Sequence, residues 1–152
     1  QVPMPEAPTE PMPLAQPGST SAPVPHHHPT PAPTAAQRWS DYAHRCAAIK
    51  GVVSCCVFDL RSQLALAHAG GLPSGEKLAI QGGLLVDAIA NAAESLGLGH
   101  APPEAAISIG QQHLLLRPVP GHPGVVLHLT LQASANNLTL ARMQLERVVV
   151  PV

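Results

Sequence analysis

The hydrophobic pattern of the chain first becomes regular after residue 34. The apolar residues there fall at intervals of three, four and three positions: Trp39, Tyr42, Cys46 and Ile49. That spacing places them along one stripe of a helix. The segment 35–50 is therefore predicted to be an amphipathic helix that ends at Gly51, because glycine commonly follows a helix.

Two apolar runs of strand length come next. GVVSCCVFDL, residues 51–60, is apolar on both parities, so a strand there needs cover on both faces of its sheet. LALAHAGG, residues 64–71, follows a polar link that begins with Arg61 and Ser62. Two such runs joined by a short polar link predict a β-hairpin.

A long helix is predicted to follow Ser74, a residue type that caps helix N-termini. Lys77 stands where a complete capping box would have Glu or Gln. Apolar residues mark two faces of this segment: Leu78, Leu85, Ile89 and Leu96 on one, Ile80, Leu84 and Ala88 on the other. We expect this helix to be covered on two sides and to end at Gly97.

Gly82 and Gly83 lie inside that helical pattern. Each glycine costs a helix interior about 1 kcal/mol relative to alanine. Close approach of another backbone, such as a partner helix, is the expected compensation.

Three strand-like segments and a helix complete the pattern. They cover residues 105–110, 111–120, 125–132 and 134–148. The third, VVLHLTLQ, alternates most clearly, and the helix is predicted to be capped by Ser134 or Asn136. The order α-β-β-α-β-β-β-α predicts an α+β fold, with a hairpin, a covering helix, a three-stranded meander and a closing helix.

Residues 1–34 differ sharply from the rest in composition. They hold 11 of the 18 prolines, no aromatic residue, no Lys or Arg, and only two acids, Glu6 and Glu10. Such a stretch has too little apolar surface to offset its ordering entropy, so we expect a disordered proline-rich linker or tail. Residues 35–152 are long enough for one domain with its own core. Because the first residue is Gln1, we expect an upstream domain or a removed signal peptide before it.

Charge and aromatic content argue against a nucleic-acid partner. Eight Lys and Arg nearly balance nine Asp and Glu, without clustering. Trp39, Tyr42 and Phe58 are the only aromatic residues besides histidine, whereas a nucleic-acid surface is expected to show a basic stripe and stacking aromatics. No apolar run is long enough to cross a bilayer, so membrane insertion is not expected.

The candidate chemistry is sparse. Cys55 and Cys56 are adjacent on a predicted strand, so they point to opposite faces and are predicted to be buried structural residues, as is Cys46. His113 and His128 are expected on one face of the last hairpin, with no third ligand to make a metal site. The sequence has no nucleophile-elbow, phosphate-loop or paired-carboxylate pattern. We therefore expect no catalytic residues, no cofactor and no metal.

Several of these segments resemble the roadblock/dynein light-chain family, whose bacterial members act with small Ras-like GTPases. GVVSCCVFDLRSQLALAHAG resembles the opening hairpin of the family, HLLLRPVPGHPGVVLHL its last hairpin, and ANNLTLARMQLERV its closing helix. The resemblance covers residues 36–149. One departure is Arg61-Ser62, where the family often has Asp-Gly, so a longer or wider turn is expected.

The resemblance implies a five-stranded antiparallel sheet, with the long helix on one face and the two terminal helices on the other. It also implies a homodimer formed through the third strand and the long helix. The residues expected at that interface are Gly82, Leu85, Ile89, Leu96, Ile107 and Ile109. Asp87, an acid within an apolar helix, is a candidate contact for a further partner, although a plain solvent-facing position is the simpler interpretation.

The function implied by the resemblance is that of a non-catalytic, dimeric scaffold or regulator of a small Ras-like GTPase in the cytoplasm. One alternative is a homodimerisation module that pairs an upstream domain and has no GTPase partner. Another is a secreted protein whose mature N-terminus is Gln1. An odd number of cysteines without framework spacing argues against the latter.

Overall fold

The computed structural model describes residues 30–152. Its helices and strands are α1 (Ala35–Ala47), β1 (Val52–Asp59), β2 (Leu64–Gly70), α2 (Gly75–Ser95), β3 (Ala105–Ile109), β4 (Gln112–Pro118), β5 (Val125–Gln132) and α3 (Leu138–Glu146). The predicted order of elements is confirmed. The predicted linker, residues 1–34, and the histidines at 26–28 lie almost wholly outside the described residues.

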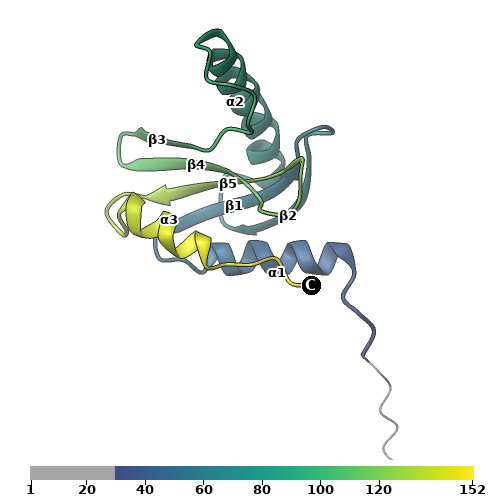
Figure 1. The fold of residues 1–152 in the computed structure, drawn as a ribbon. Helices are drawn as coiled ribbons and strands as arrows, with labels where there is room; N and C mark the ends of the chain where they lie inside the picture. The colour runs from purple at the N-terminus through teal and green to yellow at the C-terminus, as the bar shows by residue number, and fades with distance from the viewer. Residues whose placement is uncertain (1–29) are drawn as a thin grey trace, which may run out of the picture. The chain divides into compact units, whose positions relative to one another are not determined.

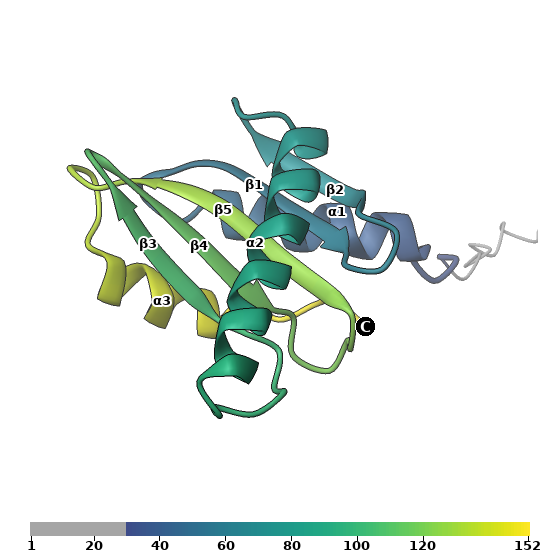
Figure 2. The same cartoon turned by 90° about the horizontal axis from the view of Figure 1, so that it is seen from above.

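The five strands form one antiparallel sheet in the order β2-β1-β5-β4-β3. β5 inserts between the first hairpin and β4, so β2 and β3 are the two edges. α2 crosses one face of the sheet, and α1 and α3 cover the other (Figure 1). Seen from above, α2 lies across the middle of the sheet and leaves β3 uncovered at one edge (Figure 2).

Successive side chains of β1 point to opposite faces of the sheet and so contribute to both halves of the core. Cys55 and Val57 pack beneath the sheet with α1 and α3, whereas Cys56 and Phe58 pack above it with α2. All four side chains are fully buried. The prediction that this strand is covered on both faces and that its adjacent cysteines point apart is confirmed.

Side-chain caps fix where the helices begin. Thr34 and Gln37 form a reciprocal capping box at α1, and the Ser74 hydroxyl accepts a hydrogen bond from the Lys77 N–H at α2, as predicted. The cap of α3 was predicted one or more residues too early. It is Asn137, whose side-chain oxygen accepts from the Leu140 N–H at 2.7 Å.

The side chain of Asn136 is oriented by partners outside the helix end, to which its Nδ2 donates. It donates to the Lys50 carbonyl at 2.9 Å and to the Gln144 side-chain oxygen at 3.1 Å. It therefore ties the end of α1 to α3.

The first helix is shorter than predicted. α1 ends at Ala47, and the N–H of its cap, Ala48, bonds back to the His44 carbonyl. Ile49 stays buried outside the helix, and Gly51 turns the chain with a φ of +89°. A side chain at Gly51 would also come within 3.1 Å of Leu131, so this turn requires glycine.

The first hairpin has the wider turn expected from its sequence. Asp59 Oδ2 accepts hydrogen bonds of 2.8 Å from the Ser62 N–H and hydroxyl, and these bonds lower the pKa of the Asp59 carboxyl. Gln63 adopts a φ of 58°, and the strand register shifts between Val57 and Phe58. The chain thus has a four-residue link where the family it resembles often has a tight Asp-Gly turn.

Candidate interaction surface

Gly82, predicted to meet a partner helix, is buried against the chain's own sheet. A Cβ there would lie 2.8 Å from the Phe58 ring and 2.9 Å from His128 Nδ1. The close approach that compensates for this glycine is therefore between α2 and the aromatic side chains beneath it. Gly82 is therefore buried within the chain itself.

Replacing Gly82 with alanine is expected to destabilise the fold, because the Phe58 ring and the His128 imidazole are fully packed and cannot move aside. Overpacking of this kind costs about 1–3 kcal/mol, offset by about 1 kcal/mol of helix propensity. Gly83→Ala is the matched control. Its Cβ meets the end of the flexible Gln63 side chain, so it should be neutral or stabilising. Urea unfolding of both variants measures the difference, and a Gly82→Ala variant as stable as Gly83→Ala would contradict the packing.

The two predicted apolar faces of α2 have different surroundings. Leu78 is buried on the sheet, and Leu85 and Ile89 are half-buried against the same core. The second face is uncovered in the described chain, with Ile80 40% exposed and Leu84 53% exposed. The expectation of cover on two sides is thus met on one side only. Leu96 falls just after the helix and is 72% exposed.

β3 carries an apolar surface on the same side of the sheet. Ala105, Ile107 and Ile109 pair with Leu116, Leu114 and Gln112, and Leu116 belongs to the core beneath α2. Directly paired residues point to the same face, so the odd-numbered residues of β3 lie on the α2 face. Ile107 is half-buried and Ile109 is 59% exposed. We call the exposed Ile80, Leu84 and Ile109, together with the half-buried Ile107, the apolar edge surface.

Asp87 is exposed on α2, beside a small hollow of about 250 Å³. The hollow is otherwise lined mainly by apolar groups, including Leu60, Val86 and Pro102, and by His100. Asp87 thus faces solvent at the border of an apolar recess. Its contact with a partner stays a prediction.

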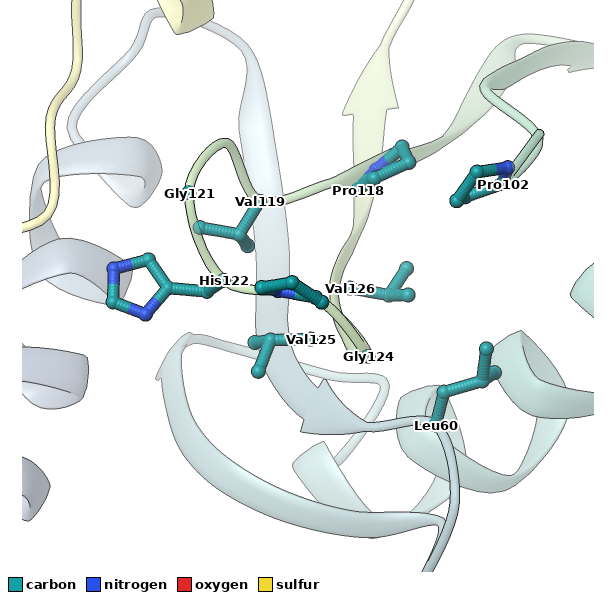
Figure 3. A pocket seen from close by; sticks show the side chains of 10 residues that line it. Leu60, Pro102, Pro118, Val119, Gly121, His122, Gly124, Val125 and Val126 are labelled. Carbon is teal, nitrogen blue, oxygen red and sulfur yellow. The ribbon is translucent and has the colours of Figure 1, made fainter.

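A second hollow, of about 380 Å³, lies where the β4–β5 loop meets Leu60 and Pro102 (Figure 3). Pro118 and Val126 form its wall and are shared with the hollow at Asp87. The His122 ring points away from the other labelled side chains, and it packs edge-on against Trp39 of α1 with ring centroids 4.8 Å apart. This recess can take an apolar side chain, and the side chains that line it include no acid or nucleophile.

His128 is buried and has one hydrogen-bond partner. Its Nδ1 lies 2.8 Å from the Leu78 carbonyl, and its Nε2 has no partner. Burial lowers the pKa of the imidazole, so the neutral form donates from Nδ1 and fastens the first turn of α2 to the sheet.

The prediction that His113 and His128 share a face is wrong. His128 pairs with Leu116 on the α2 face, whereas His113 pairs with Leu131 on the opposite face and lies 2.8 Å from the Ser108 hydroxyl. Within residues 30–152, no group of three or more His, Cys, Asp or Glu side chains is arranged to hold a metal ion.

A buried serine–histidine contact escaped the sequence analysis. Ser54 Oγ lies 2.9 Å from His68 Nε2 and donates to the Pro73 carbonyl at 2.6 Å. Ser54 has no exposed surface, so the contact holds the β2–α2 connection and does not present a nucleophile. Only the register of the first hairpin, which places residues 54 and 68 near each other, gives a signal for it.

The three cysteines are free and buried. Desolvation raises the pKa of Cys46 to about 11, of Cys55 to about 12 and of Cys56 to about 11. All three are therefore thiols near neutral pH, and the thiol is the unreactive form.

The comparisons with known proteins identify the fold. No family model and no curated protein matches the sequence. Myxococcus xanthus MglB superposes with a TM-score of 0.63 at 16% identity, covering 74% of this chain and 83% of that one. A Roadblock/LC7 domain from Streptomyces avermitilis has a TM-score of 0.59 at 15% identity, covering 72% and 92%. An MglB with a tetrameric arrangement has a TM-score of 0.63 at 18% identity, covering 76% and 85%.

The chain therefore has the roadblock/LC7 fold, and the resemblance first noted in the sequence is confirmed at that level. The arrangement it implied, a five-stranded antiparallel sheet between one long helix and two terminal helices, is also confirmed. Among the described helices, none is both long and apolar enough to span a membrane.

Proposed function

We propose that residues 35–152 form a non-catalytic, homodimeric regulatory module that binds a small Ras-like GTPase in the cytoplasm. The observation that carries the proposal is the apolar edge surface. The uncovered side of α2 carries the exposed Ile80 and Leu84, and β3 is an open edge of the sheet. Figure 2 shows α2 over the sheet with β3 at its edge.

A second copy of the chain is the occupant that this surface fits best. β3 contains no proline and no charged residue, the two devices that commonly protect an edge strand from pairing. Ile109 and Leu84 each leave more than half of their side-chain surface in contact with water. Exposed apolar patches of this kind mark interaction sites. Leu85 and Ile89 lie at the border of the surface, and Leu96 lies beyond the end of the helix.

The chemistry of the described residues supports a non-catalytic role. The cysteines are buried thiols with raised pKa values, and Ser54 is fully enclosed with its proton used by a carbonyl. His128 is fastened to the backbone of α2. The three cysteines, Ser54 and His128 are thus committed to packing.

A GTPase partner is proposed from the fold and from the recess at Asp87. The fold is that of MglB, and the family that the sequence resembles acts with small Ras-like GTPases. Asp87 and the apolar groups beside it offer a contact for a basic and an apolar side chain of such a partner. Asp87 is on α2 and borders the hollow at Leu60 and Pro102.

Binding to a small Ras-like GTPase of the same organism tests the partner. The full chain is titrated against that GTPase loaded with GDP and with a non-hydrolysable GTP analogue. We expect an affinity difference of at least about tenfold, because a regulator shifts an equilibrium only by binding its two states unequally. Equal affinities would exclude regulation through nucleotide state, and no binding to either form would exclude the GTPase.

A homodimerisation module that pairs an upstream domain is the second candidate. The apolar edge surface supports this second function equally, because a homodimerisation module needs contacts only with a second copy of the chain. A dimer that binds neither nucleotide form of the GTPase would favour this function.

A further inference from the structure

Within residues 30–152, three of the four buried polar side chains lie on the α2 face of the sheet. Ser54, His128 and Thr130 are 0%, 2% and 3% exposed. Ser54 pairs with Thr130 across β1 and β5, and His128 lies two positions before Thr130, so the three side chains share one face. The core beneath α2 is therefore partly polar.

Two hydrogen bonds from this polar group attach the start of α2 to the sheet. The Ser54 hydroxyl donates to the Pro73 carbonyl at 2.6 Å, just before the helix. His128 Nδ1 lies 2.8 Å from the Leu78 carbonyl, to which it donates from the neutral ring. Both acceptors are backbone groups, so the contacts position the helix itself.

Few apolar side chains reinforce this attachment. Among residues 75–82, Leu78 is the one large apolar side chain that is buried. Gly75 and Gly82 approach side chains of the sheet closely but have no side chain to bury, and Ile80 is exposed on the outer face. Segments with few buried apolar contacts are the ones that open while the rest of a fold stays intact.

The surroundings of His128 fit the neutral ring. A neutral imidazole carries one N–H, here on Nδ1, whereas the protonated ring carries a second on Nε2. Nε2 is buried and has no acceptor, and Thr130 Oγ1 is also buried without a partner. A buried charge and an unpaired N–H both cost free energy. Protonation therefore favours an opened α2, in which water reaches both atoms.

No charged group compensates for that cost. The residues that surround the ring are Cys56 and Phe58 of β1, Leu116 of β4, Thr130 of β5, and Leu78 and Gly82 of α2. Burial raises the pKa of Cys56 to about 11, so it is a neutral thiol. His68 of β2 pairs with the far side of Cys56. The charged residues of α2, all exposed, are Glu76, Lys77, Asp87 and Glu94.

We propose that His128 is an acid-sensitive latch, whose protonation releases the first half of α2 while the sheet stays folded. The inference is independent of the proposed function, because every group involved belongs to one chain. Burial holds the pKa of the folded imidazole below its ordinary value of 6.5. The attachment is therefore complete above pH 6.5 and is lost as the pH falls below it. Since α2 carries Ile80 and Leu84, acid also loosens the apolar edge surface.

Amide hydrogen exchange of the full chain tests the latch. Between about pH 7.5 and about pH 5.5, the opening constant of the α2 amides of residues 79–84 should rise by up to about tenfold, after correction for intrinsic exchange rates, because the opened form gains one proton. Amides at the centre of β5, such as that of Leu129, should be more protected than those of α2 at both pH values, because they exchange only when the sheet unfolds.

Two histidine variants assign the effect. His128→Asn should abolish the rise, because an asparagine amide can donate to the Leu78 carbonyl and does not titrate. His68→Gln is the matched control and should keep the rise. His68 Nε2 lies 2.9 Å from Ser54 Oγ, whose proton goes to Pro73, so this nitrogen donates in either charge state of the ring.

The outcomes decide between the latch and a plain buried histidine. A rise of less than about twofold, or an equal rise in His128→Asn, would overturn the latch. So would α2 amides as protected as those of β5, because α2 would then open only with the whole fold. If His128→Asn does not fold, nitrogen NMR of the natural chain replaces it. A His128 ring that titrates at or above pH 6.5 in the folded chain would overturn the proposal.

Discussion

Replacing Leu84 with glutamate is expected to dissociate the proposed homodimer into monomers. Leu84 is 53% exposed on the uncovered face of α2, and α2 lies on the same side of the sheet as the odd-numbered residues of β3. Burying an unpaired carboxylate at an interface costs several kcal/mol, and about 3 kcal/mol raises a dissociation constant by more than 100-fold. The monomer itself loses little, since the side chain already contacts water. Sedimentation or light scattering at micromolar concentration measures the change in mass.

Leu140→Glu is the matched control for this variant. Leu140 is also a leucine on a helix, 45% exposed, but α3 lies on the opposite face of the sheet. Its substitution should leave the dimer intact. A Leu84→Glu variant that stays dimeric, or a Leu140→Glu variant that dissociates, would place the interface elsewhere.

Stability is expected to fall steeply as the pH rises from 9 to 10. Burial raises the pKa of Cys46, Cys55 and Cys56 to about 11, about 12 and about 11, while the unfolded thiols titrate near their ordinary value of 9.0. Above that value the unfolded chain releases protons that the folded chain retains, so unfolding is favoured. Each thiol contributes up to about 1 kcal/mol per pH unit, and three contribute about 3 kcal/mol. That is a large part of the 5–15 kcal/mol typical of a domain.

Urea unfolding at a series of pH values measures this dependence. The informative quantity is the slope of the free energy of unfolding against pH. Replacing Cys55 with alanine should reduce the slope between pH 9 and 10 by about a third, whatever it does to the absolute stability. Tyr42, whose pKa is also raised by burial, adds to the loss only above its ordinary value of 10.0. A stability that stays level up to pH 10 would mean that the thiols are not buried as described.

Periodicity and cap chemistry were sufficient to predict the elements. The period of two in β5 and the double apolar parity of β1 identified strands that the structure contains. Ser74 identified the start of α2 because a cap acts through its own neighbours. Asn137 was missed because Asn136, next to it, offers the same kind of side chain. The contacts of Asn136 to Lys50 and Gln144 orient it away from the helix end, and no local pattern shows them.

The surroundings of the residues beneath α2 and of the edge strand could not be predicted, because they depend on contacts between segments far apart in the sequence. Gly82 adds no side chain to the hydrophobic pattern, so the pattern did not show that it faces Phe58. His128 is polar in an alternating strand, a pattern that does not show whether a helix covers it. Its burial depends on α2, more than forty residues away, supplying the Leu78 carbonyl. The open edge at β3 likewise depends on β5 entering between β1 and β4.

The mass of the full chain in solution, measured by light scattering across a hundredfold range of concentration, tests the central claim most directly. A chain of 15.7 kDa that pairs through its apolar edge surface should show twice that mass at every concentration. A mass of one chain throughout would contradict the homodimer, and with it the function proposed for this surface.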